Sequence, residues 1–119
     1  MARILVVDDD FEIRRLVARM LQIQGHDPVQ AENGADALTV IEQGKIDLVV
    51  SDLRMPIMDG YTLFTELRER GFLLPFIIVS GHATEHTEAV LAADAFLPKP
   101  FAFADLVKTV EGVLGRVPA

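Results

Sequence analysis

The sequence predicts an α/β fold in which a five-stranded parallel sheet is covered by helices on both faces. Three short runs, residues 4–7, 48–50 and 76–79, are continuously apolar and rich in β-branched side chains, which is typical of strands buried on both faces. Between the strand-like runs lie segments whose apolar residues recur with the period of an amphipathic helix. Alternation of these two patterns indicates βαβ units, and therefore a parallel sheet.

The first half of the chain contains two strand–helix units. Strand 4–7 is followed by a helix that we expect to end at Gly25. The apolar face of this helix follows the spacing i, i+3, i+4, i+7, i+8 through Ile13, Leu16, Val17, Met20 and Leu21. The next strand, 28–31, contains proline, which favours an edge position. A second helix over about 35–43 then stops at Gly44.

The second half continues the alternation. Strand 48–50 precedes a helix over about 60–70, and strand 76–79 precedes a short helix between 84 and 92. Strand 95–98 contains proline and is the second expected edge strand. The last helix, about 102–114, has an apolar face formed by Phe103, Leu106, Val107, Val110, Val113 and Leu114.

The composition excludes several classes of protein. The 119 residues suit one domain, and half of them are apolar, so a sizeable core can be buried. No apolar run reaches the length of a membrane span and the N-terminus lacks a signal-peptide pattern, so we expect a cytoplasmic protein without membrane association. Cysteine is absent, which excludes disulfides and thiolate metal sites.

The charge pattern argues against direct nucleic-acid binding. The net charge is −7, and an acidic domain of this size repels nucleic acid unless it carries a concentrated basic face. The pairs Arg14-Arg15 and Arg68/Arg70 are isolated on predicted helices and do not form such a face.

Polar side chains follow four of the five predicted strands. These residues are Asp8, Asp9 and Asp10, then Ser51 and Asp52, then Ser80, and finally Lys99. Because ligands of such sheets bind at the carboxyl ends of the strands, we expect these groups to meet at one edge. Single residues have simpler interpretations: Asp10 is an expected helix N-cap, and Asp59 an expected cap or turn residue. The functional interpretation therefore depends on the combination.

The clustered carboxylates require a counter-charge. Lys99 supplies one positive charge, which is too little for Asp8, Asp9 and Asp52. Mg²⁺ accepts oxygen ligands and is typically held by one or two carboxylates plus a phosphate, whereas the histidine and cysteine ligands of zinc are missing from this cluster. A carboxylate beside Mg²⁺ and lysine can attack phosphorus and form an acyl phosphate, so Asp52 is a candidate phosphoacceptor. The Ser80 hydroxyl is a candidate hydrogen-bond donor to a phosphoryl oxygen.

Four motifs at these strand ends resemble those of response-regulator receiver domains of two-component signalling systems, the CheY-like superfamily. "ILVVDDD" resembles the acidic first strand, "DLVVSDLRMPIMDG" the phosphoacceptor strand and its loop, "PFIIVSG" the strand that ends in a switch hydroxyl, and "AFLPKPF" the last strand with its Lys-Pro pair. The resemblance covers essentially all 119 residues. It implies one receiver domain over residues 1–119 with a flavodoxin-like (βα)5 fold and the strand order 2-1-3-4-5.

The resemblance also implies roles for individual residues. Asp52 corresponds to the phosphorylated aspartate, Asp9 to a direct Mg²⁺ ligand and Asp8 to an acid that acts through water. The backbone carbonyl of Arg54 is the remaining implied protein ligand. Lys99 would contact the phosphoryl group, and a cis Lys99–Pro100 bond is expected.

The implied function is that of a switch, not of an enzyme with a separate substrate. A sensor histidine kinase or a histidine phosphotransfer protein would donate a phosphoryl group to Asp52 with Mg²⁺ as cofactor, and the domain would catalyse only this transfer and its own dephosphorylation. Ser80 and Phe96 occupy the two switch positions, and their movement would change the surface seen by a downstream protein or output domain.

Two features depart from or add to the family pattern. Between Ser80 and Lys99 the chain is about three residues shorter than usual, close to one helical turn, so we expect a truncated or irregular fourth helix; a harmless deletion is the alternative. Arg54 and His82 lie two residues after Asp52 and Ser80, and we expect both to tune the hydrolysis of the acyl phosphate.

The two other histidines, His26 and His86, are expected to face solvent, and no function is assigned to them.

Three rival functions remain for the chain. A haloacid-dehalogenase-like phosphatase would use Asp8 as nucleophile and Asp10 as acid, but Glu12 replaces its usual threonine. A flavin carrier needs a hydroxyl- and glycine-rich phosphate loop after the first strand, where three aspartates would repel phosphate. A receiver that binds proteins without phosphorylation would not need the intact acid, serine and lysine set.

Overall fold

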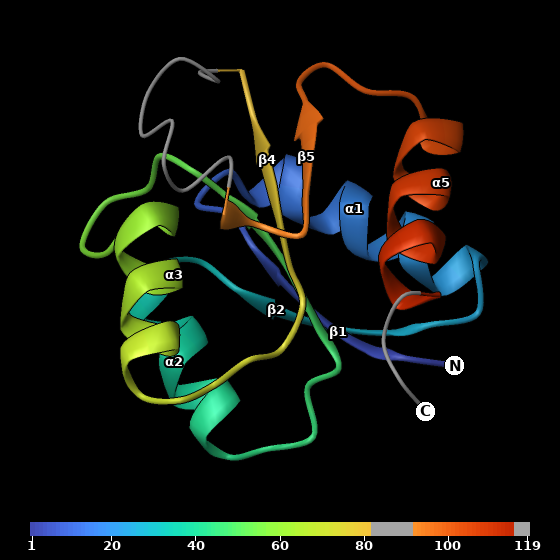
Figure 1. The fold of residues 1–119 in the computed structure, drawn as a ribbon. Helices are drawn as coiled ribbons and strands as arrows, with labels where there is room; N and C mark the ends of the chain where they lie inside the picture. Colours follow the sequence, from blue (N-terminus) through green and yellow to red (C-terminus); the bar gives the residue numbers. More distant parts are fainter. Residues whose placement is uncertain (82–91, 116–119) are drawn as a thin grey trace.

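A five-stranded parallel sheet runs through the middle of the molecule (Figure 1) in the computed structural model, which describes residues 1–81 and 92–115. The strands are β1 (Arg3–Val7), β2 (Asp27–Ala31), β3 (Leu48–Asp52), β4 (Phe76–Ser80) and β5 (Ala95–Pro98). Their order is β2-β1-β3-β4-β5, which confirms the predicted order and places the two proline-containing strands at the edges. The three continuously apolar strands occupy the centre, where both faces of the sheet are covered.

Helices cover both faces of the sheet. Figure 1 shows α1 (Phe11–Ile23) and α5 (Phe103–Leu114) on one face and α2 (Gly34–Glu42) and α3 (Gly60–Glu69) on the other. The α/β fold class predicted from the sequence is therefore confirmed. Residues 82–91 lie outside the described residues. They include His82, His86 and all but the last residue of the short or irregular fourth helix expected between 84 and 92, so these expectations stay predictions.

Each strand contributes alternate side chains to two separate cores. The core facing α2 and α3, called the α2/α3 cluster here, consists of Leu5, Val7, Ala31, Ala37, Leu38, Ile41, Val49, Leu53, Leu63, Phe64, Leu67, Phe76 and Ile78. The core facing α1 and α5, called the α1/α5 cluster, consists of Ala2, Ile4, Val6, Val17, Leu21, Leu48, Val50, Ile77, Val79, Leu97, Leu106, Val110 and Val113. Burial of each large side chain contributes about 1.5–3 kcal/mol, so the helices are held mainly by these faces.

Side-chain caps begin three of the helices. The Asp10 carboxylate accepts hydrogen bonds from the backbone N–H groups of Glu12 (3.0 Å) and Ile13 (3.2 Å) at the start of α1. Asp59 accepts one from Thr62 (2.8 Å) at the start of α3. The N-cap interpretation of Asp10 and Asp59 is therefore confirmed, and α2 is capped in the same way by an asparagine.

Three expectations about individual side chains are wrong. Leu16 was placed on the buried face of α1 but is 54% exposed, because Val17 and Leu21 are the residues that meet the sheet. Leu16 instead borders an open groove beside the turn after β5. Phe103 is 39% exposed although it shares a face with the buried Leu106 and Val110, because it is the first residue of α5 and lies at the end of the helix.

The third correction is His26, which was expected to face solvent. Its side chain is 8% exposed. The backbone N–H of Ala2 donates to its Nδ1 (3.0 Å), and its Nε2 lies 2.9 Å from a carboxylate oxygen of Glu111. The ring is enclosed because the turn after α1 packs between the start of β1 and the end of α5.

The loop between β3 and α3 contains a strained turn. The Met58 N–H donates to the carbonyl oxygen of Pro56 (2.8 Å), which forces Ile57 between them to a φ of 71°. The Gly34 N–H donates to the Met58 carbonyl oxygen (2.9 Å), and a Cβ at position 34 would lie 2.6 Å from that oxygen. Close approach of α2 to this loop therefore requires glycine, and the contact holds the strained turn in place.

Replacement of Ile57 by asparagine is expected to stabilise the domain. A β-branched residue at positive φ is unfavourable by about 1–2 kcal/mol, asparagine tolerates this conformation, and the Ile57 side chain is 83% exposed and so loses little packing. Chemical denaturation of Ile57→Asn should show a free energy of unfolding about 1 kcal/mol higher than that of the wild type. Ile57→Val, which keeps the β-branch, is the matched control and should show no gain; a less stable Ile57→Asn would contradict the strain argument.

Candidate functional site

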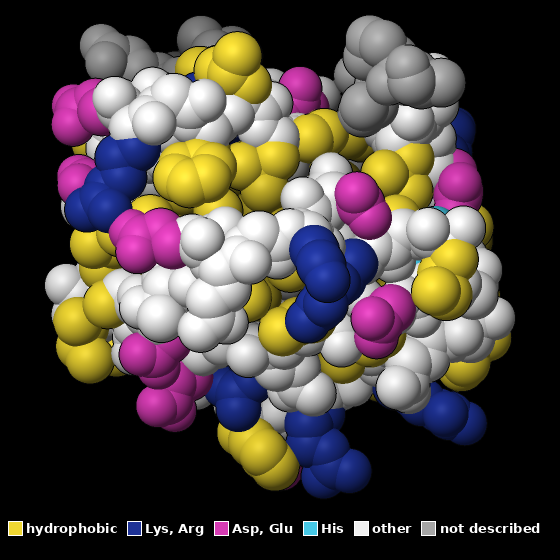
Figure 2. All heavy atoms as spheres, turned by 90° about the horizontal axis from the view of Figure 1, so that it is seen from below, with side chains coloured by type: hydrophobic (Ala, Val, Ile, Leu, Met, Phe, Trp, Pro, Cys, Tyr) yellow, Lys and Arg dark blue, Asp and Glu magenta, His cyan; other side chains and the backbone are white. Residues whose placement is uncertain are grey.

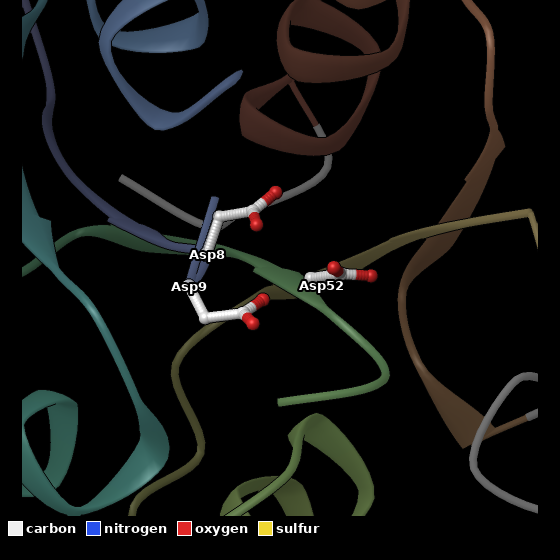
Figure 3. A group of neighbouring side chains, drawn as sticks. All are labelled: Asp8, Asp9 and Asp52. Carbon is white, nitrogen blue, oxygen red and sulfur yellow. The ribbon is translucent and has the colours of Figure 1, made fainter. Parts of the chain in front are cut away.

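Three carboxylates meet at the carboxyl edge of the sheet. Asp8 and Asp9 directly follow β1, and Asp52 is the last residue of β3. One oxygen atom from each lies within 4.8 Å of the other two. Figure 3 shows the three side chains extending to the same side, into a common space beyond the strand ends. The expected convergence of these residues is therefore present in the structure.

Strand register explains why two of these acids face each other. The β1–β3 ladder pairs Val7 with Ser51, so the following residues, Asp8 and Asp52, occupy equivalent positions one step further along. Successive side chains alternate between the two faces of a sheet, and Asp8, Asp52 and Lys99 each lie two residues after a strand residue of the α1/α5 cluster. All three therefore point to the same face as they leave the sheet.

The Lys99 ammonium group joins the two acids. Its Nζ donates to Oδ2 of Asp8 and to Oδ2 of Asp52, each at 3.2 Å. The other oxygen of each acid accepts a backbone N–H: Asp10 donates to Oδ1 of Asp8 (2.9 Å), and Leu53 donates to Oδ1 of Asp52 (2.8 Å). Each carboxylate is thus oriented by a neutral donor on one oxygen and a cation on the other.

Burial and charge shift the pKa values of two members of this group. Burial raises the pKa of the Asp8 carboxyl and the Asp52 carboxylate adds to the rise, while the Asp10 N–H and the Lys99 ammonium oppose it without cancelling it. Burial alone would lower the pKa of Lys99, but the carboxylates of Asp52 and Asp8 outweigh burial and raise it. Lys99 therefore stays charged at neutral pH, and the folded site disfavours the ionised form of Asp8.

The donor set fits a hard divalent cation. Three carboxylates against one ammonium leave two negative charges without compensation, and oxygen is the ligand that Mg²⁺ prefers. The side chains of Asp8 and Asp52 are only 7% and 13% exposed, whereas Asp9 is exposed to solvent. A cation held here would contact protein on one side and keep waters on the other.

Ser80 and Phe96 lie on the opposite face from the lysine. Ser80 is the last residue of β4 and is 1% exposed. The β4–β5 register pairs Ile78 with Phe96, so Phe96 shares a face with Ile78 and Ser80. Phe96 is partly buried and packs against the α2/α3 cluster.

Other residues singled out from the sequence have different positions. The Ser51 hydroxyl is fully buried and donates to the Asp52 carbonyl oxygen (2.8 Å), so it braces β3 and does not enter the acidic space. Arg54 lies in the loop after β3 and is exposed. The peptide bond between Lys99 and Pro100 is cis.

Arg14 is a polar contact of the site that the sequence interpretation missed. Its Nη1 donates to the backbone carbonyl oxygen of Asp8 (2.8 Å). In the sequence Arg14 is a member of one of two isolated arginine pairs. The signal that could have revealed the contact is its separation of four residues from the N-cap Asp10, about one helical turn. A residue one turn into a helix that begins just after a strand lies above the end of that strand.

The end of the molecule opposite the acids carries mixed charges. Figure 2 looks from below onto the end where the strands begin, and there Lys and Arg side chains lie interspersed with Asp, Glu and apolar side chains. This face has no concentrated positive field of the kind that attracts nucleic acid. Among the described helices, none is long and apolar enough to cross a membrane.

Comparison with known proteins identifies the class to which this fold and site belong. The sequence model of the response regulator receiver domain matches residues 4–111, and the chain belongs to this family. Its sheet order is that of the flavodoxin-like, CheY-like proteins. Receiver domains are phosphorylation-dependent signalling modules of two-component systems; they are generally not classed as enzymes and generally bind Mg²⁺ at an acidic pocket.

Individual relatives are similar over nearly the whole chain. The sensor kinase CckA of Brucella abortus is 42% identical over 120 residues, which cover 97% of this chain and 13% of CckA. The response regulator MprA of a Mycobacterium species is 37% identical over 117 residues, which cover 96% of this chain. The chain spans about half the length of MprA, with 51% covered.

A solved structure of the same kind superposes closely. The response regulator TrrA of Thermotoga maritima, in complex with Mg²⁺-BeF, has a TM-score of 0.87 and 34% sequence identity, covering 95% of this chain and 99% of TrrA.

Replacement of Asp8 by asparagine is expected to stabilise the metal-free domain. Because the pKa of Asp8 is raised by folding, the folded state favours the protonated carboxyl, and this contribution to stability is lost as the pH rises through the folded-state pKa. In chelator at pH 7, Asp8→Asn should melt a few degrees higher than the wild type, as about 1 kcal/mol produces in a domain of this size. The difference should shrink as the pH falls below 3.8, the ordinary carboxyl value, where both proteins are neutral at this position.

The control for this prediction is Asp10→Asn, which removes a neighbouring charge and keeps an N-cap, and which should change the melting temperature little. A lower melting temperature for Asp8→Asn at pH 7 would show that its bonds to Lys99 and Asp10 outweigh the burial of its charge.

Proposed function

We propose that this chain is a phosphorylation-activated switch in which Asp52 accepts a phosphoryl group from phosphohistidine. The observation that carries the proposal is the position of the Lys99 ammonium, 3.2 Å from both Asp52 and Asp8, with Asp9 completing a trio of oxygens within 4.8 Å. This arrangement places one cation and two further carboxylates around Asp52.

The chemistry assigned to Asp52 is nucleophilic attack on phosphorus. A carboxylate oxygen forms a bond to phosphorus, the P–N bond to the donor imidazole breaks, and the imidazole nitrogen takes the electron pair and then a proton. The side chain of Lys99 already bonds Asp52 and is placed to neutralise a phosphoryl oxygen once the acyl phosphate has formed.

Mg²⁺ is the proposed cofactor, and when bound it would offset negative charge on the entering phosphoryl group. Asp9 and Asp52 are the proposed direct ligands, Asp8 acts through water, and the backbone carbonyl of Arg54 completes the protein ligands. The trio of acids supports this assignment, as does the Mg²⁺-BeF complex of the similar TrrA. Loss of Asp9 should therefore impair metal binding more than protein stability.

Ser80 and Phe96 are the proposed switch residues. Both lie on the same face of β4 and β5, and the Phe96 side chain is only partly buried. In the proposed switch, the Ser80 hydroxyl moves toward the phosphoryl oxygens and the Phe96 ring fills the space that it leaves. Because Phe96 has no hydroxyl, burial alone should decide between its two positions.

The proposed partners follow from this role. A sensor histidine kinase or a histidine phosphotransfer protein supplies the phosphoryl group in the cytoplasm, and a downstream protein or output domain reads the changed surface. Direct binding to nucleic acid or membrane forms no part of the proposal. The single receiver domain over residues 1–119 is the unit to which it applies.

Phosphorylation by a small phosphodonor tests the proposal directly. Incubation with phosphoramidate and Mg²⁺ should add one phosphoryl group, and borohydride trapping followed by peptide mass spectrometry should place it on Asp52. Asp52→Asn should stay unmodified, and Asp10→Asn, which changes an adjacent N-cap, should be modified like the wild type. Label on Asp8 would instead favour the phosphatase-like reaction, and no label in the presence of Mg²⁺ would rule out the switch.

Hydrolysis of the acyl phosphate should depend on Arg54 and His82. Both follow a proposed site residue by two positions, and a change of about threefold in lifetime needs less than about 1 kcal/mol of altered barrier. Arg54→Ala and His82→Ala should each change the decay rate of phosphorylated Asp52 by about threefold or more, measured by loss of the phosphorylated mass. Unchanged decay in both variants would remove the tuning role and leave the phosphoacceptor assignment intact.

A further inference from the structure

The backbone of the acidic site leaves the β1–β2 ladder at Asp8. The Asp8 N–H still donates to the carbonyl oxygen of Ala31 (3.2 Å), which extends the β1–β2 ladder by one step. The Asp8 carbonyl oxygen instead accepts Nη1 of Arg14 (2.8 Å), a side chain from α1. A buried carbonyl at the end of a strand needs a partner, and here a charged side chain supplies it.

This carbonyl belongs to the peptide unit that joins Asp8 and Asp9, so its orientation sets the direction in which both side chains leave the chain. Asp8 has further supports in Asp10 and Lys99. Among the described residues, the exposed Asp9 carboxylate has no hydrogen-bond donor of its own, although one of its oxygens lies within the trio (Figure 3). The position of Asp9 therefore depends on the backbone in front of it.

Arg14 is itself held in place by two other contacts. Its Nε donates to Oε1 of Gln30 on β2 (3.1 Å), and its guanidinium carbon lies 5.4 Å from the centre of the Phe11 ring. A planar guanidinium bonded through two different nitrogens and stacked on an aromatic ring has little freedom to turn. The Arg14 side chain therefore links the Asp8–Asp9 peptide to α1 and β2 at a fixed distance.

We propose that Arg14 is a positioning residue for the metal site: it holds the Asp8–Asp9 peptide so that the Asp9 carboxylate faces the cation. The inference rests on the proposed Mg²⁺ function of the acids and adds to it a residue that touches neither the cation nor the phosphoryl group. Groups that orient metal ligands typically contribute about 10- to 100-fold to metal affinity.

The sign of the effect distinguishes positioning from charge. Arg14 is a cation close to the acids, so its charge alone repels Mg²⁺, and removal of that charge would strengthen metal binding. Loss of its hydrogen bond to the Asp8 carbonyl would loosen Asp9 and weaken metal binding. The two explanations thus predict opposite changes in the same measurement.

The test is calorimetric titration of the full chain with MgCl₂ alone. Arg14→Met keeps the length of the side chain and should weaken Mg²⁺ binding by about tenfold. The matched control is Arg15→Met. The guanidinium carbon of the neighbouring Arg15 also lies 5.4 Å from the centre of the Phe11 ring, but the hydrogen bond to the Asp8 carbonyl oxygen comes from Arg14. This control should bind Mg²⁺ as tightly as the wild type or slightly more tightly.

If Arg14→Met folds poorly, a second variant and a hydrogen-exchange measurement test the same positioning role. Arg14→Lys retains the charge but cannot bond Asp8 and Gln30 with one planar group, so it should also weaken Mg²⁺ binding, by about threefold. In metal-free samples the backbone N–H of Asp9 should exchange its hydrogen faster in either Arg14 variant than in Arg15→Met. This N–H belongs to the same peptide unit as the Asp8 carbonyl, which has lost its hydrogen bond to Arg14.

Wild-type or tighter Mg²⁺ affinity in folded Arg14→Met or Arg14→Lys would overturn the positioning role. This result is separable from failure of the proposed function, because a wild-type chain that neither binds Mg²⁺ nor accepts phosphate on Asp52 would refute the switch itself. A wild-type chain that does both, beside Arg14 variants that bind Mg²⁺ normally, would refute only the inference about Arg14.

Discussion

Repulsion among carboxylates at one edge of the sheet is the constraint around which this domain is arranged. Asp8 and Asp52 leave neighbouring strands on the same face, and the Lys99 ammonium lies 3.2 Å from each. The raised pKa of Asp8 indicates that this compensation is incomplete in the absence of metal, because burial still disfavours its charge. The site is therefore poised to gain from a divalent cation, and the stability that the fold gives up here is available to metal binding.

The rest of the fold can be understood as support for that crowded edge. Two cores of closely packed aliphatic side chains hold the strands in register, and the register determines which side chains meet beyond the strand ends. N-caps at Asp10 and Asp59 begin helices directly after β1 and after the loop that follows β3. The strained turn at Ile57 is held against α2 by the contact between Met58 and Gly34, so strain close to the site is stabilised by packing outside it.

Membership of the receiver family and the geometry of the acids support each other without being the same evidence. The family match covers residues 4–111 and establishes a signalling module. The geometry goes to the level of single atoms: Lys99 and two backbone N–H groups bond the carboxylates of Asp8 and Asp52, and Arg14 bonds the Asp8 carbonyl oxygen. The chain corresponds to about half of the response regulator MprA and to 13% of the sensor kinase CckA.

The sequence by itself determined the fold class, the strand order implied by its motifs, and the set of acids with their lysine. These features are local: apolar runs mark buried strands, prolines mark the edges, and polar residues mark the strand ends. Only the tertiary structure decided that Leu16 lies outside the core, that His26 is enclosed, and that Arg14 reaches the Asp8 carbonyl. Each of those outcomes depends on the angle at which a helix crosses the sheet and on which side chain of another segment lies opposite. Sequence spacing along one element carries no information about that partner.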